Sequence, residues 1–469
     1  MIAWDEQADV IVVGSGVAGL SAAIEAKQAA VSVLVFEKMK VTGGNTRISD
    51  GGLAAPGNYL QKRQGIEDSP ELFYKDMMQA GLGLNHPQLV RVVAERAAET
   101  IDWTRNVLGV NYQDRLDRFG GHSVARCLTT RNHSGSDIIK AQRAKLSHLG
   151  EEIHTGCLMI GLLTGSTGAV LGVQIRTGFK FPDENSGVIK NIRANRAVVL
   201  ATGGFANDIR FRMLQNPGLD ESISSTNHRG ATAEGLVAAL RIGAAPIHLS
   251  WIQMGPWGCA DETGYGQGAR FASYSVYPAG ILIDPATGCR IVNEWSDRRQ
   301  RCEAIFKAGH ACLGIVDAEG AEKDVDSLQN CLNSGKIQGF EKITALAAAY
   351  GIPPHPLEIT VNRYNQMAGE RSRDEFGKPF HQGAKPLVTP PFYAIRLWPK
   401  VHYTSGGVGI NPNTEVIDIY NRPIPRLFAA GEICGGIHGA SRLGCCALPE
   451  CIVFGRIAGE RAASLHPQT

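Results

Sequence analysis

The sequence predicts an α/β fold built on a parallel sheet, with a second domain inserted into it. Three observations lead to this prediction. Near the N-terminus, a buried strand, a glycine-rich turn, a helix and a second strand follow one another. Two more strand-to-glycine turns occur far along the chain. With 469 residues the chain is also too long for one ordinary core, so two or three domains are expected.

Composition excludes several classes of protein. The chain is 43% hydrophobic and 20% charged, as in ordinary globular proteins. A formal net charge of +2 favours neither nucleic acid nor an anionic membrane as partner. No apolar run approaches the roughly 18 residues that cross a bilayer. The eleven cysteines form no CxxC pair, so no metal site is expected. The cysteines are expected to be reduced thiols. "MIAWDEQADVIVVGSG" lacks an export signal, which predicts a cytoplasmic location, or a periplasmic one if a signal has been trimmed.

The first element is a buried strand, Val10–Val13, that leads into Gly14, Gly16 and Gly19 and then a helix. The next strand, 31–36, ends at Glu37, which lies 23 residues after Gly14. Glycines in this pattern let the backbone approach a pyrophosphate at a helix N-terminus, and the carboxylate is placed to bind a ribose hydroxyl. The segment therefore predicts a Rossmann-like dinucleotide-binding unit.

The stretch "EKMKVTGGNTRISDGG" follows at once, and its glycines are too dense for an ordinary helix entry. A backbone wrapped around a flat, extended ligand explains it best, and this favours FAD over NAD. Further strands at 197–201 and 427–430 end in Thr202-Gly203-Gly204 and Gly431-Glu432. One nucleotide domain assembled from distant segments is expected.

Seven motifs along the chain resemble the fumarate reductase/succinate dehydrogenase flavoprotein family, in particular its soluble flavocytochrome-type branch. They are "GSGVAGL", "EKMKVTGGNTRISDGG", "NHRGATAEGLVAALRIGA", "VNRYN", "PFYAIRLWPKVHYTSGGV", "LFAAGEICGGIHGASRLG" and "FGRIAG". The resemblance implies a Rossmann-like FAD-binding domain at 1–245 and 399–469, with an inserted α+β capping domain at 246–398. It also implies hydride transfer at the flavin.

The expected FAD contacts come from these motifs and from the glycine turns. They are Gly14, Gly16, Ala18, Gly19, Glu37, Lys38, Gly43, Gly44, Asn45, Thr46, Ser49, Gly51, Gly52, Ala201, Thr202, Gly203, Glu234, Gly431, Glu432, Arg442, Gly444, Ala447 and Leu448. Membrane-bound members of the family attach FAD to a histidine. The matching position here is Asn45, so non-covalent FAD is predicted.

A single arginine stands inside the apolar stretch "HGASRLGCCALPE", and a buried guanidinium needs an anion. The resemblance makes Arg442 the residue that binds a substrate carboxylate, for which its planar fork is suited. His402 in "VHYTSGG" is implied to bind the same carboxylate. Arg298 in "VNEWSDRRQRCE" is implied to deliver a proton to the substrate carbon, with Arg299 as the alternative if the alignment is one residue off.

The second half of the family's dicarboxylate site is altered. Gly255 stands where fumarate reductases have a histidine, and Ser273, Tyr274 and Tyr277 replace a Thr-Glu pair and an arginine. The two phenols could donate hydrogen bonds and carry protons, or be ordinary half-buried strand residues. Gly255 is expected to leave room for something bulkier or flatter than a carboxylate.

These residues predict an FAD-dependent oxidoreductase that reduces, or forms, an activated C=C bond of an unsaturated carboxylic acid. One alternative is a 3-ketosteroid dehydrogenase-like desaturase using Tyr274, Tyr403 and Ser405. The other is a non-catalytic FAD-binding subunit. No haem motif or second nucleotide fingerprint was found, so a separate electron donor or acceptor, a protein or a reduced flavin, is the expected partner.

Overall fold

A computed structural model describes residues 2–380 and 384–468, and the chain divides into two compact units. The first unit comprises Met1–Asp220, His228–Ile252 and Tyr403–Thr469, and the second comprises Glu221–Asn227 and Gln253–His402. The sequence placed the domain borders at 245/246 and 398/399. The units therefore divide a few residues later at both borders, and the short segment 221–227 joins the second unit.

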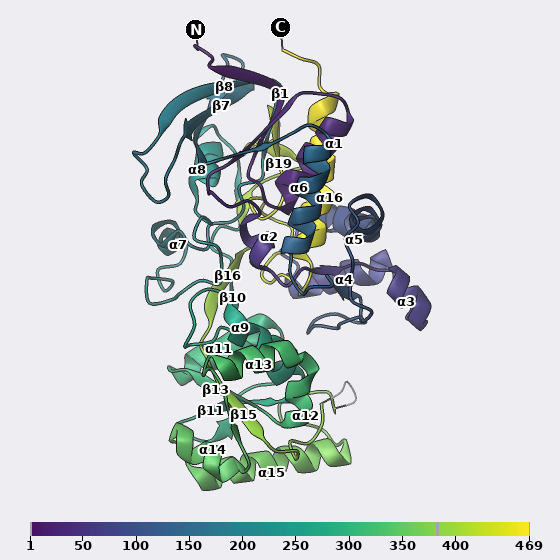
Figure 1. Ribbon diagram of the computed structural model, residues 1–469, viewed down its shortest axis with the longest axis vertical. Coiled ribbons are helices and arrows are strands. Elements are labelled where there is room, and N and C mark those ends of the chain that lie inside the picture. Colours follow the sequence, from purple (N-terminus) through teal and green to yellow (C-terminus); the bar gives the residue numbers. More distant parts are fainter. Residues whose placement is uncertain (1, 381–383, 469) are drawn as a thin grey trace. The chain divides into compact units, whose positions relative to one another are not determined.

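The first unit is organised by one large sheet (Figure 1). Its path runs β18-β19-β8-β1-β2-β5, and β7 pairs with β8 while β6 pairs with β7. β1 is parallel to both β2 and β8, with Val10 opposite Val33 on one side and Ala197 on the other. The strands of this sheet are β1 (Glu6–Val13), β2 (Val33–Glu37), β5 (Ile153–Thr155), β6 (Cys157–Thr164), β7 (Val170–Thr177), β8 (Val188–Leu200), β18 (Glu415–Ile417) and β19 (Pro423–Ala429). The predicted α/β fold is confirmed: β19, β8, β1, β2 and β5 run parallel, whereas β18 and the β6–β7 pair join the sheet antiparallel.

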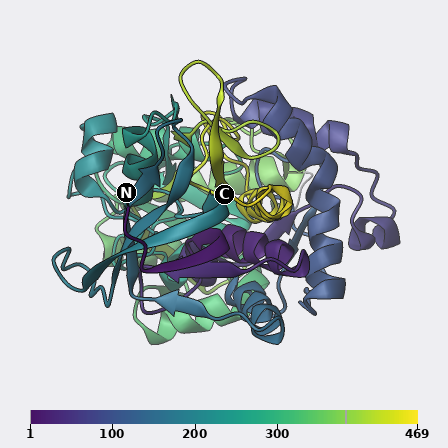
Figure 2. The same cartoon turned by 90° about the horizontal axis from the view of Figure 1, so that it is seen from above.

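Helices α1 (Val17–Gln28), α6 (Ser136–His148) and α16 (Ala447–Ser464) lie side by side on this sheet (Figures 1 and 2). Two glycines allow α16 to approach α1 very closely. A Cβ at Gly455 would lie 2.4 Å from the Ala18 carbonyl oxygen, and one at Gly459 would lie 2.2 Å from that of Ala22. The C-terminal helix α16 therefore packs directly on the backbone of α1, the helix that follows the first glycine turn.

The remaining elements of the first unit surround this core. The helices are α2 (Gly44–Ile48), α3 (Tyr59–Gln64), α4 (Pro70–Ala80), α5 (Pro87–Asp102), a π-helical turn (Trp103–Val107), α7 (Ile209–Gln215) and α8 (Glu234–Arg241). The short strands are β3 (Gly52–Ala54), β4 (Cys127–Thr129), β9 (Pro246–Ile247) and β17 (Gly407–Val408). The chain passes between the units within β10 (Ile252–Gly255) and β16 (Lys400–Thr404).

The second unit contains a five-stranded antiparallel sheet with helices on both faces. Its strands lie in the order β12 (Cys289–Arg290), β11 (Ile281–Asp284), β13 (Cys312–Val316), β15 (Phe392–Leu397) and β14 (Gln338–Phe340). Alternate residues of β11 point to opposite faces, as a strand requires. Ile281 and Ile283 pack with Leu357 and Val361 of α15, whereas Leu282 packs with the cluster around Phe271. The inserted α+β architecture predicted for this part of the chain is confirmed.

The second unit contains helices and strands in the following chain order. They are α9 (Gly266–Phe271), a π-helical turn (Ala272–Val276), α10 (Tyr277–Ala279), β11 (Ile281–Asp284), β12 (Cys289–Arg290), α11 (Arg298–Ala308), β13 (Cys312–Val316), α12 (Ala318–Ala321), a 3-10 turn (Glu322–Asp324), α13 (Val325–Asn333), β14 (Gln338–Phe340), α14 (Ile343–Tyr350), α15 (Pro354–Glu370) and β15 (Phe392–Leu397).

The structure excludes one open alternative and corrects one local expectation. The segment containing Tyr274 and Tyr277 is helical and both side chains are buried, so they are not half-buried strand residues. The glycine-rich segment after β2 contains the short helix α2. Tertiary contacts hold it there, because the Thr46 hydroxyl accepts a hydrogen bond from the Val17 backbone N–H at the start of α1. Across the described ranges, no helix combines the length and apolarity needed to cross a membrane.

Candidate active site

The turn between β1 and α1 is built by close backbone contacts. Gly14 has φ +108°, and a Cβ there would lie 2.2 Å from the Ala201 carbonyl oxygen of the neighbouring strand. A Cβ at Gly19 would lie 2.0 Å from the Gly14 carbonyl oxygen. At Gly16, by contrast, a Cβ would meet nothing within 4 Å. Gly14 and Gly19 therefore shape the turn, and Gly16 leaves its outer side open.

Glu37 ends β2 and ties the second strand to this turn. Its Oε2 accepts hydrogen bonds from the Ser15 hydroxyl at 2.6 Å and the Ser15 N–H at 3.1 Å, and its Oε1 accepts one from the Met39 N–H at 2.8 Å. The carboxylate thereby fixes the loop that follows, and it lines the adjacent pocket.

One pocket of the first unit collects most of the expected cofactor contacts. Those that line it are Gly14, Gly16, Ala18, Glu37, Lys38, Gly44, Asn45, Thr46, Ala201, Thr202, Gly203, Glu234, Gly431 and Glu432. They come from five separate parts of the chain, at the carboxyl ends of β1, β2 and β8, at the start of α8 and after β19. This edge of a parallel sheet is where doubly wound folds bind nucleotides.

The other expected cofactor residues lie outside this pocket's lining. They are Gly19, Gly43, Ser49, Gly51, Gly52, Arg442, Gly444, Ala447 and Leu448. Several serve close packing in the first unit: a Cβ at Gly52 would lie 2.5 Å from Cys445 Sγ, and one at Gly51 would lie 2.5 Å from Thr130 Oγ1.

The pocket fits an extended dinucleotide. Gly16, Gly44 and Gly203 all line it, and at none of them would a Cβ meet a protein atom within 4 Å. The backbone is thus exposed to whatever fills the pocket, which suits contact with phosphates. Sequence reasoning missed the wall formed by Leu158 and Met159 on β6, since an apolar strand carries no mark of ligand contact.

Asn45 lines the pocket and links two of its walls. Its side-chain oxygen accepts a hydrogen bond from the His228 N–H at 2.8 Å, and its amide lies 3.4 Å from Glu432 Oε2. Burial raises the pKa of Glu432. Asn45 therefore bridges two distant segments of the pocket wall.

Arg442 lies in a buried loop of the same unit and is 6% exposed. Its Nη1 donates to the Leu443 carbonyl at 2.9 Å, and its guanidinium lies 4.6 Å from the centre of the Tyr403 ring. Nearby, the Glu450 carboxyl lies 3.4 Å from Cys451 Sγ and 4.0 Å from His438 Nε2. Burial, together with the charge of Glu432, raises the pKa of Glu450 to about 8.

The second unit brings Arg298 and His402 together around one indole. The Arg298 guanidinium lies 4.5 Å from the Trp257 ring centre, and the His402 ring meets the same ring edge-on at 5.0 Å. Arg298 is the first residue of α11, and its Nη1 donates to Gln253 Oε1 at 3.0 Å. His402 Nδ1 lies 2.8 Å from the Thr226 hydroxyl, which fixes the orientation of the imidazole ring.

Arg299, the alternative to Arg298, points elsewhere. It pairs with Glu303 on the exposed face of α11, with 40% of its side chain accessible. A solvated i,i+4 pair of this kind is worth little. The contacts to Gln253 and Trp257 therefore favour Arg298 as the functional residue.

Contacts within the protein account for three positions at which the sequence departs from the family pattern, Gly255, Ser273 and Tyr277. A Cβ at Gly255 would lie 3.1 Å from the Trp257 ring, so the room left by this glycine is taken by the indole. The Ser273 hydroxyl donates to the Ala269 carbonyl within its own helix at 2.8 Å. The Tyr277 hydroxyl donates to the Pro256 carbonyl at 2.8 Å, and burial raises the phenol's pKa far above its usual value. Tyr277 therefore holds its proton.

Arg301 is a buried cation that sequence reasoning missed. It lies one turn after Arg298 on α11, is 8% exposed, and its guanidinium sits 4.3 Å from the centre of the Tyr277 ring. Burial lowers its pKa. In the sequence it stands in the charged run "DRRQRCE", where nothing distinguishes it from its neighbours.

The parallel sheet and its glycine-lined pocket define a dinucleotide-binding flavoprotein. A family model described as "FAD binding domain" matches residues 9–448, and the chain belongs to this family. The protein binds FAD, and its resemblance to the fumarate reductase flavoproteins is confirmed.

Named relatives agree with this assignment. The chain is 39% identical to an acrylate reductase flavoprotein subunit of Shewanella woodyi, over 97% of this chain and 91% of that protein. It is 34% identical to a urocanate reductase of Eggerthella lenta, over 97% and 75%. The structure of an open flavocytochrome c3 fumarate reductase matches with a TM-score of 0.80 and 31% identity, over 98% of this chain and 79% of that one. The protein is an FAD-dependent oxidoreductase.

The glycine turn makes a paired prediction. Gly16→Ala adds a methyl group only on the pocket side, so the cofactor-free protein should unfold as the wild type does, while FAD binding weakens about tenfold or more. Gly19→Ala forces a Cβ against the Gly14 carbonyl and should destabilise the cofactor-free protein by about 1–3 kcal/mol. Thermal unfolding and FAD titration measure the two effects. Equal losses of stability in both variants would contradict the assignment.

Glu450 predicts a pH-dependent stability. Its folded pKa of about 8 exceeds the ordinary 4.5, so its proton stabilises the fold fully below pH 4.5 and this contribution is lost as the pH rises through 8. The loss is bounded at roughly 5 kcal/mol. Glu450→Gln keeps the shape without the ionisation, so the melting temperature of the variant should fall less between pH 5 and 9. A difference between the two proteins that is constant over this range would refute the prediction.

Proposed function

We propose that the protein reduces the carbon–carbon double bond of an unsaturated carboxylic acid that carries a single carboxylate. The observation that carries the proposal is the grouping of Arg298 and His402 around Trp257, in a chain 39% identical to an acrylate reductase flavoprotein subunit. The bound flavin supplies the hydride in this chemistry. The protein's own residues hold the acid and supply the proton.

Arg442 and His402 are the proposed carboxylate-binding residues. A guanidinium offers two parallel charge-assisted hydrogen bonds to a carboxylate, and an imidazole N–H adds another. The Tyr403 ring beneath Arg442 and the Thr226 hydroxyl beside His402 restrain the two side chains, so little rotamer freedom is lost when the acid binds.

Arg298 is the proposed proton donor to the substrate carbon. Gln253 and Trp257 hold its guanidinium in place. Ser273, Tyr274 and Tyr277 are proposed to shape the site of the second unit rather than to bind a second carboxylate. The buried Tyr277 phenol is already bonded to Pro256.

The size of the substrate follows from the same positions. The Trp257 indole fills the space beside Gly255. The surroundings of His402 are aromatic, because the ring centres of Trp257 and Tyr265 lie 5.0 and 6.4 Å from that of the imidazole. A small or flat apolar remainder suits these surroundings better than a second charged group. Acrylate-like acids are therefore preferred over fumarate.

The proposed electron donor is a separate protein or a free reduced flavin. The relative from Shewanella woodyi is itself named a flavoprotein subunit, which supports a separate partner. FAD is proposed to be non-covalent, because Asn45 offers no ring nitrogen for attachment. All eleven cysteines are free thiols, which supports the proposed cytoplasmic location.

The substrate proposal is tested with dithionite-reduced protein offered acrylate, an aryl-acrylate, urocanate, fumarate and a 3-ketosteroid. Reoxidation of the flavin absorbance should follow addition of a monocarboxylic unsaturated acid, and Arg442→Ala should abolish it while keeping FAD bound. Reaction with the steroid alone would instead support a desaturase built on Tyr274, Tyr403 and Ser405. A flavin-loaded protein inert to every compound would support a non-catalytic subunit.

The proton-donor assignment is tested by two neighbouring variants. Arg298→Ala should lower kcat by roughly 10²- to 10⁴-fold, the usual contribution of a positioned acid. Arg299→Ala removes only a solvated pair with Glu303 and should stay within about twofold of the wild type. Steady-state rates with the preferred acid measure both. Equal activity of the two variants would remove Arg298 from the proposed mechanism.

A further inference from the structure

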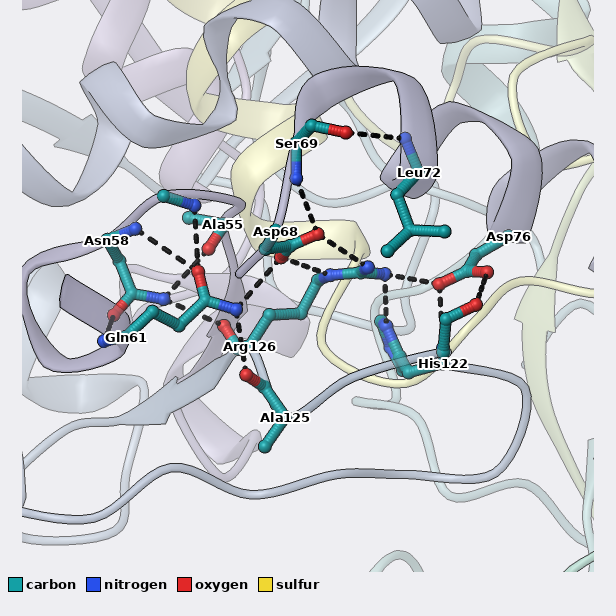
Figure 3. A network of polar contacts seen from close by, with 12 residues as sticks. Ala55, Asn58, Gln61, Asp68, Ser69, Leu72, Asp76, His122, Ala125 and Arg126 are labelled. Carbon is teal, nitrogen blue, oxygen red and sulfur yellow. Dashed lines mark hydrogen bonds and ion pairs between the residues drawn. The ribbon is translucent and has the colours of Figure 1, made fainter. Parts of the chain in front are cut away.

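A buried ion network in the first unit surrounds Arg126, whose side chain is fully buried (Figure 3). Its Nε and Nη2 donate to the two oxygens of Asp68 at 2.8 and 2.9 Å, and its Nη1 donates to Asp76 at 2.5 Å. Burial alone would lower the arginine's pKa, but the two carboxylates raise it. Breaking a buried network of this kind is costly, so the guanidinium is held in one position.

Further hydrogen bonds anchor the network to the backbone. Gln61 donates to Asp68 at 2.8 Å and to the Ala125 carbonyl at 2.8 Å. Asp76 accepts from the Ser123 N–H at 2.8 Å. The segment that carries Arg126 is therefore tied to both α3 and α4.

His122 extends the network toward the loop of Arg442. Arg126 Nη1 donates to His122 Nδ1 at 3.1 Å, so Nδ1 is an acceptor and the ring proton lies on Nε2. Nε2 then donates to the Gly444 carbonyl at 2.9 Å. Burial and the charge of Arg126 lower the pKa of His122 to about 4, which keeps the ring neutral with this tautomer.

The turn before His122 also packs on the same loop. A Cβ at Gly444 would lie 3.0 Å from the Phe119 side chain, and one at Gly121 would lie 2.6 Å from a methyl group of Leu443. Arg118 in turn donates to the His122 carbonyl at 2.8 Å. The turn and the loop are thus closely packed, and the hydrogen bond from His122 to the Gly444 carbonyl joins them.

We propose that His122 is a positioning residue that fixes the backbone of the 442–445 loop, and through it the guanidinium of Arg442, for binding an anionic substrate. Arg442 Nη1 donates to the Leu443 carbonyl, so its direction depends on the peptide that joins Leu443 to Gly444. The next peptide carries the carbonyl that His122 holds. Cys445 has φ +59°, a conformation costly for a non-glycine residue that needs such external support. The proposal rests on the substrate-binding role proposed for Arg442.

Two amide variants distinguish the hydrogen bond between His122 Nε2 and the Gly444 carbonyl from the other contacts of His122. In His122→Gln the side-chain amide reaches about as far as Nε2 and keeps a donor for the Gly444 carbonyl. In His122→Asn it reaches only about as far as Nδ1, so it keeps contact with Arg126 and loses Gly444. Both are studied as FAD-loaded protein by hydrogen–deuterium exchange of residues 438–448 and by steady-state kinetics with the preferred unsaturated acid.

His122→Asn should speed exchange in this segment about tenfold and raise KM by a similar factor, with kcat changed less than about threefold. In His122→Gln the exchange rate of this segment and KM should both stay within about threefold of the wild type. Unchanged exchange in His122→Asn, or equal impairment in both variants, overturns the proposal. If His122→Asn does not fold, His122→Phe, which keeps the ring without a donor, takes its place under the same criteria.

The exchange measurement also distinguishes this proposal from the proposed function. If the wild type reduces no unsaturated acid, the function fails, and the exchange of residues 438–448 still decides whether His122 fixes the loop. If the wild type is active and exchange responds but KM does not, His122 holds the loop without positioning Arg442, and the proposal is rejected.

Discussion

The cofactor pocket of the first unit depends on how closely backbone segments approach one another around the first glycine turn. Gly14 and Gly19 bring β1, α1 and the end of β8 within contact distances that no side chain would permit. Gly455 and Gly459 do the same between α1 and α16. These contacts hold the ends of β1 and β8 and the helices α1 and α16 together at the edge of the sheet that lines the pocket. The cofactor site thus depends on backbone packing as well as on the side chains of Glu37 and Asn45.

Buried arginines bond to different kinds of partner in different parts of the molecule. Arg290 of the second unit is neutralised by Glu294 and Asp374, and Arg126 of the first by Asp68 and Asp76. These are structural networks, complete within the protein. Arg298 and Arg442 each lie against an aromatic ring and donate to an uncharged oxygen, a side-chain amide in one case and a backbone carbonyl in the other.

Much of the fold was predictable because its signals are local. The strand–glycine–helix pattern around Gly14 and the carboxylate at Glu37 lie within one short segment, and the structure has them as expected. For Tyr274 and Tyr277 the sequence left two alternatives, phenols that carry protons or half-buried strand residues, and the structure buries both in a helical segment of the second unit. The helix at Gly44–Ile48 was missed because the contact of Thr46 with α1 outweighs the low helix propensity of glycine.

The sequence by itself determined the fold class and the dinucleotide-binding segment, because motif spacing encodes backbone turns, and its resemblance to a family supplied the residues proposed to bind and protonate the substrate. Only the tertiary structure showed that Trp257 occupies the space beside Gly255, that Arg301 is buried, and that His122 reaches the loop of Arg442. His122 and Gly444 lie 322 positions apart in the chain. Contacts across such separations depend on the packed positions and hydrogen-bond directions of whole elements, which no local pattern of residues specifies.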